Sequence, residues 1–125
     1  MALAELEKVE RNEDGIALVL DLLRQRYGDR LVTGQSVREQ HAHSTSYIPP
    51  QLPDAVFAPN NAEEVQDAVR ICAEHRVPVI PFGTGSSLEG HVNAPAGGIS
   101  LDLMNMNRIL SVNAEDLDCT VEPGV

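Results

Sequence analysis

The chain has 125 residues, which is enough for one domain. Its formal net charge is −10, from 9 Lys and Arg against 19 Asp and Glu, and its basic residues are scattered singly, which disfavours nucleic acid and anionic lipid as partners. Aromatic residues make up 3% of the chain and offer few platforms on which bases could stack.

The sequence contains neither a stretch typical of a membrane-spanning helix nor a recognisable export signal. No stretch approaches the ~18 consecutive apolar residues of a membrane-spanning helix. The first residues, Met1 to Arg11, alternate apolar and acidic side chains and lack the apolar core of a signal peptide. We therefore expect a cytoplasmic protein without a membrane span.

The first predicted element is a helix over Asp14 to Tyr27. Apolar residues recur at helical spacing from Ile16 to Leu23, and Gly28 follows where a helix C-terminus favours glycine. This helix belongs to an N-terminal helical segment that we place at residues 1–34.

The next stretch, Val32 to Pro53, is polar and proline-rich, which predicts an irregular connection with a short helix possible over Ser36 to Gln40. Within it, His41 and His43 have the i, i+2 spacing that would place two metal ligands on one side of a strand. No third ligand is near in the sequence, so we interpret both histidines as part of a solvated loop.

A strand, a helix and a second strand follow in a compact unit. Ala55 to Ala58 is a short apolar run between prolines, and Asn61 begins an amphipathic helix that must end before Pro78. Val77 to Phe82 is the second apolar strand. Two strands joined by one helix imply a parallel pair.

Three more short strands are predicted at Ile99 to Leu103, Ile109 to Val112 and Cys119 to Glu122. The fold class is therefore α+β: an N-terminal helical segment, then a βαβ unit and short mixed strands over residues 35–125. Cys72 and Cys119 lie far apart without metal-ligand spacing, and we expect two buried free thiols.

The segment from Pro81 to His91 is rich in glycine and hydroxyl side chains and follows a predicted buried strand. Small residues leave backbone N–H groups free and allow a ligand to approach closely, which is how an anion is bound without a cationic side chain. A phosphate or a pyrophosphate would suit this loop. Glu89 is acidic and would have to point away from such a ligand.

Two common nucleotide motifs do not fit the loop. Gly85 and Gly90 have Walker A spacing, but His91 and Val92 occupy the lysine and hydroxyl positions. Leu88 replaces the third glycine of a dinucleotide-binding fingerprint, and no helix continues after it. On residue chemistry alone, a glycine-rich turn without a ligand stays open as an alternative.

The order and spacing of five motifs resemble a known family. The motifs are Pro53-Asp54-Ala55-Val56, Pro59 with Asn61 to Glu64, the stretch from Val77 to Gly90, Leu101-Asp102-Leu103, and the stretch from Val121 to Val125. Residues 35–125 resemble the first lobe of the PCMH-type FAD-binding domain in FAD-linked oxidases of the vanillyl-alcohol-oxidase type. Within that family they are most similar to the branch of D-lactate dehydrogenase (cytochrome) and the glycolate oxidase FAD subunit.

This resemblance implies noncovalent FAD, with the pyrophosphate wrapped by backbone amides of Gly83 to Ser87 and with Pro123-Gly124 against the cofactor. A covalent tether would sit inside the glycine loop, so His91 is expected to hydrogen bond beside the flavin or to end a strand. The implied cofactor-binding residues are Pro81, Phe82, Gly83, Thr84, Gly85, Ser86, Ser87, Gly90, His91, Pro123 and Gly124.

The family transfers a hydride from the α-carbon of a D-2-hydroxy acid to flavin N5. The resemblance places the second FAD lobe, the substrate cap and the catalytic histidine and arginine region after Val125, so this chain alone is expected neither to retain FAD nor to turn over substrate. We assign it no catalytic residue and no metal ligand. The alternative is a noncatalytic half-domain that self-associates through exposed strand edges.

Overall fold

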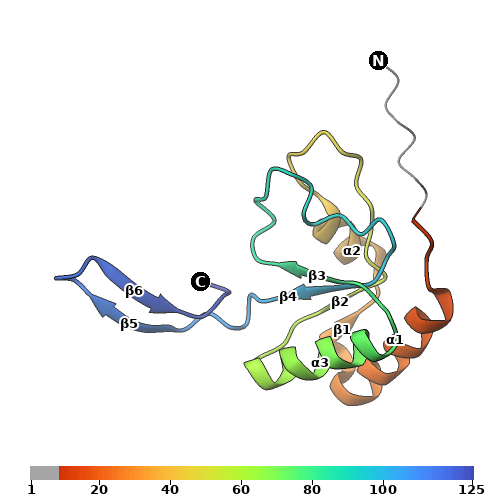
Figure 1. The fold of residues 1–125 in the computed structure, drawn as a ribbon, viewed down its shortest axis with the longest axis horizontal. Coiled ribbons are helices and arrows are strands. Elements are labelled where there is room, and N and C mark those ends of the chain that lie inside the picture. The colour runs from red at the N-terminus through yellow and green to blue at the C-terminus, as the bar shows by residue number, and fades with distance from the viewer. Residues whose placement is uncertain (1–8) are drawn as a thin grey trace.

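The structure, a computed structural model, describes residues 9–125 and confirms a mixed α+β fold (Figure 1). None of the helices in that range is long and apolar enough to cross a membrane. The elements in chain order are α1 (Glu13–Tyr27), the 3-10 turn η1 (Gly28–Arg30), β1 (Leu31–Val32), α2 (Gln35–Ala42), β2 (Ala55–Phe57), α3 (Ala62–Glu74), β3 (Val79–Phe82), β4 (Ile99–Asp102), β5 (Ile109–Asn113) and β6 (Asp118–Val121).

The main sheet has the strand order β1-β2-β4-β3. Strands β2 and β3 both run parallel to β4, whereas β1 pairs antiparallel to β2. The predicted parallel orientation of β2 and β3 is confirmed, but the two strands do not pair directly, because β4 lies between them. Every residue of β4 is buried, as is expected for a central strand that is covered on both faces.

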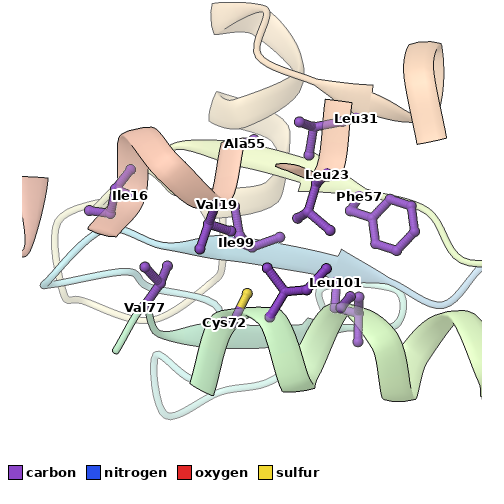
Figure 2. Packing of buried hydrophobic residues seen from close by; sticks show 12 residues of the cluster. Ile16, Val19, Leu23, Leu31, Ala55, Phe57, Cys72, Val77, Ile99 and Leu101 are labelled. Carbon is purple, nitrogen blue, oxygen red and sulfur yellow. The ribbon is translucent and has the colours of Figure 1, made fainter. Parts of the chain in front are cut away.

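Helices α1 and α3 cover one face of this sheet (Figure 1). Figure 2 shows Val19 and Leu23 of α1 packed over Phe57 and Ile99 of the strands, and all four side chains are fully buried. Each such side chain contributes about 1.5–3 kcal/mol of transfer free energy. Helix α1 thus shares its core with the sheet, while the boundary drawn between residues 34 and 35 stays a prediction.

Helix α2 lies on the opposite face of the sheet, and it is longer than predicted (Figure 1). His41 is on this helix and only 8% exposed, so the interpretation of His41 as part of a solvated loop is wrong. His43, just beyond the helix, is exposed. The i, i+2 argument assumed a strand, whereas on a helix residues two apart point to different sides.

Strands β5 and β6 form an antiparallel hairpin that extends away from the body of the molecule (Figure 1). All residues of both strands are exposed. Cys119 is consequently exposed, and the prediction of two buried thiols holds only for Cys72. Burial raises the pKa of the Cys72 thiol to about 11.

Helices α1 and α3 are joined at the surface by Asp67. Its carboxylate accepts hydrogen bonds from the side chains of Arg26, Arg70 and Tyr27, the last at 2.7 Å. These donors, Arg26 first, hold the pKa of Asp67 well below its usual range. Burial and the neighbouring Asp67 raise the pKa of Tyr27 to about 12.

The Asp67 contacts predict a stability loss in acid. Since the pKa of Asp67 is lower in the folded chain than the ordinary value of about 3.9, its ion pairs stabilise the fold above that pH and are lost as the pH falls through the folded-state pKa. Asp67→Asn should lower the free energy of unfolding at neutral pH by about 1–2 kcal/mol and flatten its acid dependence in urea titrations. Asp21→Asn is the control, because the exposed Asp21 carboxylate accepts its hydrogen bond from Gln25 of its own helix. Equal acid dependence in both variants would contradict the assignment.

Candidate functional site

A pocket of about 320 Å³ opens beyond the carboxyl end of β3. One wall is the glycine loop and the other is the segment that follows β6. Nine of the eleven predicted site residues line it, although their role stays a prediction. The lining residues are Pro81, Gly83, Thr84, Gly85, Ser86, Ser87, His91, Val92, Pro123, Gly124 and Val125.

The glycine loop presents unused hydrogen-bond donors. Within the part of the chain that the structure describes, the backbone N–H groups of Gly83 to Glu89 donate no hydrogen bond to a protein atom. The Thr84 hydroxyl donates to Ser86 Oγ at 3.2 Å, and the buried Ser87 Oγ has no protein partner. Buried polar groups are normally paired, so the unpaired Ser87 hydroxyl, together with the open main-chain donors beside it, indicates a polar ligand.

Gly85 shapes the loop through its backbone conformation. Its φ is +72°, and a Cβ there would lie 2.9 Å from Phe82 Cζ and 3.8 Å from the His43 carbonyl oxygen. Phe82 is buried beneath the loop and does not line the pocket. Gly90 is the other predicted residue outside the pocket, and a Cβ there would meet Ile48.

The second wall is held by the turn after β4. The N–H of Gly124 donates to the carbonyl oxygen of Met106 at 2.8 Å. A Cβ on Gly124 would collide with the Leu103 carbonyl oxygen, so this backbone approach requires glycine. Just before it, Arg108 pairs with Glu122 at 2.6 Å and closes the base of the hairpin.

None of the side chains that line the pocket belongs to a Lys, Arg, Asp or Glu residue. The titratable side chain of the lining is that of His91, which is exposed. Glu89 is exposed as well and does not line the pocket. Among residues 9–125, no three His, Cys, Asp or Glu side chains gather where they could hold a metal ion.

Sequence reasoning missed two lining residues and one supporting pair. Val92 and Val125 line the pocket and directly follow predicted residues in the chain, so sequence adjacency was the available signal. His41 and Asp102 lie below the loop, where Nε2 of His41 is 2.9 Å from Oδ2 of Asp102. They are 61 residues apart in sequence, and no local pattern indicates their contact.

Comparison with known proteins shows to which family the chain belongs. Residues 53–125 match the family described as "FAD binding domain". The chain belongs to this family.

Its relatives include two curated proteins. A protein named "Probable D-lactate dehydrogenase, mitochondrial" from Danio rerio is 44% identical over 108 residues, covering 86% of this chain and 22% of the relative. "Glycolate oxidase subunit GlcD" from Bacillus subtilis is 46% identical over 74 residues, covering 59% of this chain and 16% of the relative. The chain thus spans about a fifth of the length of these relatives.

The fold also matches solved structures. Substrate-bound p-cresol methylhydroxylase superposes with a TM-score of 0.78 at 24% identity, over 90% of this chain and 23% of that chain. At this identity the likeness concerns the fold.

The pocket fits part of an FAD molecule. Free main-chain donors and the unpaired Ser87 hydroxyl suit pyrophosphate oxygens, and the absence of side chains at Gly83 and Gly85 leaves room for close approach. Its volume lies at the low end of the range of about 300–1,000 Å³ for drug-sized ligands, which are smaller than FAD. These residues therefore suit the centre of the dinucleotide and leave its ends to other contacts.

At Gly83, an added side chain would enter the space of the ligand without disturbing the packing of the protein. A Cβ at Gly83 meets no protein atom within 4 Å, and its φ lies outside the left-handed region. Gly83→Val should change the free energy of unfolding by no more than about 0.5 kcal/mol and weaken FAD binding at least about tenfold, because the side chain occupies ligand space. Urea denaturation and FAD titration measure the two effects. An unchanged FAD affinity would place the ligand elsewhere.

Proposed function

We propose that this chain supplies the pyrophosphate-binding lobe of an FAD-dependent dehydrogenase for D-2-hydroxy acids of the D-lactate and glycolate type. The observation that carries the proposal is the neutral cradle of free N–H groups at Gly83 to Ser87, which faces Pro123 and Gly124 across the pocket. The names of its relatives, a D-lactate dehydrogenase and a glycolate oxidase subunit, support the substrate class.

In this proposal, the residues of this chain bind the cofactor and orient it. The loop amides and the Ser87 hydroxyl would hold the pyrophosphate oxygens, and the Pro123-Gly124 wall would limit movement of the cofactor. When bound, FAD supplies N5 of its ring system as the acceptor of a hydride from the substrate α-carbon. No arginine lines the pocket, so groups that clamp the substrate carboxylate lie in other parts of the enzyme.

Ligand titrations test this function. The chain is titrated with FAD, FMN and riboflavin, and binding is followed by flavin fluorescence and visible absorption. Saturable, readily reversible binding of FAD is expected, with inorganic pyrophosphate as a competitor and with riboflavin weakest because it has no phosphate. No turnover of D-lactate with a dye acceptor is expected from the chain alone. Equal affinity for FAD and riboflavin, or no FAD binding at saturation, would overturn the pyrophosphate assignment.

The hairpin favours a second candidate, a noncatalytic half-domain that self-associates. Ile109, Leu110 and Val112 of β5 are 63%, 57% and 68% exposed, and both outer edges of the hairpin are unpaired. Exposed apolar strands with free edges pair readily with other strands. The edge strand β3 is less suited to pairing because Pro81 lacks an N–H donor.

Charge substitutions on the hairpin test the alternative. Leu110→Lys with Val112→Lys should convert a self-associated chain to a monomer in analytical ultracentrifugation, because burying two lysines at a strand interface is unfavourable. Val69→Lys, an exposed apolar position on α3, is the matched control and should leave association unchanged. A monomeric unsubstituted chain would exclude this candidate.

A further inference from the structure

His41 and Asp102 form a buried pair between helix α2 and the end of β4. They are 8% and 7% exposed, and Nε2 of His41 lies 2.9 Å from Oδ2 of Asp102. The other ring nitrogen, Nδ1, lies 2.8 Å from the carbonyl oxygen of Val37. A carbonyl only accepts, so Nδ1 carries a proton, and a second proton is shared between Nε2 and the carboxylate.

On one side, the pair supports the glycine loop. The His41 ring packs on the Phe82 ring with centroids 4.3 Å apart. Phe82 in turn lies directly under Gly85, since a Cβ there would come within 2.9 Å of its ring. Phe82 and Asp102 are also partners in the register of β3 and β4. The position of the first pocket wall therefore depends on how His41 is held.

On the other side, Asp102 fixes the turn that carries the second wall. Its Oδ1 accepts a hydrogen bond from the N–H of Met104 at 2.9 Å. The turn is closed by the bond from Met106 N to Leu103 O at 2.9 Å, and the carbonyl of Met106 accepts from Gly124 at 2.8 Å. One carboxylate thus connects the base of the glycine loop with the Pro123-Gly124 wall.

We propose that His41 and Asp102 are positioning residues that set the spacing between the two walls of the FAD pocket. The proposal goes beyond the proposed function and rests on it for the identity of the ligand. Neither residue lines the pocket, so both act through Phe82, Gly85 and the turn after β4.

Removing one proton from the pair would disrupt this arrangement. The ring would then turn a lone pair toward either the Val37 carbonyl or the Asp102 carboxylate, and one of its two hydrogen bonds would be lost. Phe82, which packs against the ring, is uncharged. Asp102→Asn keeps both contacts, because its amide donates to Nε2 while its oxygen still accepts from Met104.

The test compares three variants of the full chain. Asp102→Leu removes both roles of the carboxylate, Asp102→Asn is the conservative variant, and Val19→Ala destabilises the core on the opposite face of the sheet. Backbone amide NMR signals of Gly83 to Ser87 and of Gly124 and Val125 report the two walls, and FAD titration reports the assembled site. Circular dichroism reports whether each variant is folded.

The expected results are specific to the pair. Asp102→Leu should shift the amide signals of both walls and weaken FAD binding at least about tenfold. Asp102→Asn should keep FAD affinity within about twofold, and Val19→Ala should leave the wall signals in place.

Other outcomes separate the two proposals. Wall signals that are unchanged in a folded Asp102→Leu variant, or that move equally in Val19→Ala, would overturn the positioning role. If the walls respond as expected but the unsubstituted chain binds no FAD, the positioning role stands and the proposed cofactor falls.

Discussion

Gly85→Val is expected to abolish detectable FAD binding by the chain. The left-handed backbone at Gly85, with φ +72°, disfavours any residue with a Cβ and a branched one most of all. The new side chain would also press on the Phe82 ring, 2.9 Å from the Cβ position. The loop must move, and its N–H groups no longer converge on one anion. FAD titration followed by flavin fluorescence measures the loss.

Two other glycines serve as controls for Gly85→Val. Gly34→Val places a side chain in open space away from the pocket, with Val32 the nearest contact at 4.0 Å, and should keep FAD affinity. Gly83→Val should lose affinity without loss of stability, whereas Gly85→Val should also lower the free energy of unfolding by about 1–3 kcal/mol because of backbone strain. Full FAD binding by Gly85→Val would refute the loop assignment.

The second large effect is expected from Gly124→Ala. Even one methyl group would collide with the Leu103 carbonyl oxygen and would lie about 2.8 Å from that of Met106. Backbone atoms cannot rotate away as a flexible side chain can, so the second wall has to separate from the turn. We expect FAD affinity to fall at least about tenfold.

Hydrogen exchange locates the cause of this loss. In the native fold, the amide at position 124 donates a hydrogen bond to the Met106 carbonyl oxygen. In Gly124→Ala this amide should exchange much faster, and so should the amides of Val125 and Met106. Gly34→Ala is the matched control and should leave exchange and affinity unchanged. If Gly124→Ala binds FAD normally, the Pro123-Gly124 segment is no part of the site.

Local patterns predicted the elements whose stability is local. Helix α1 was predicted to within a residue at each end and helix α3 to within a residue at its start, because their apolar faces and the caps at Asn61 and Gly28 depend on residues that are close in the sequence. Strand β1 and the position of β4 were not predicted. Strand order depends on pairing between segments distant in the chain, and two-residue strands such as Leu31–Val32 carry no period.

The same division applies to the candidate site. The glycine loop was recognisable from its residue chemistry and Pro123-Gly124 through the family resemblance, and the structure brings them into one pocket. His41 was misread because its meaning depends on Asp102, which lies on another element and 61 residues away. Buried polar pairs of this kind have no sequence period, so only the assembled fold reveals them.

The protruding hairpin is continuous in the chain with one wall of the pocket. The chain leaves the body after Met106, runs out and back along β5 and β6, and returns at Glu122, just before the pocket wall (Figure 1). The Arg108–Glu122 ion pair and the hydrogen bond from Gly124 to Met106 hold the base of the hairpin beside the pocket. Since Pro123 and Gly124 follow directly after this hairpin, we expect a partner that displaces the hairpin to displace this pocket wall with it.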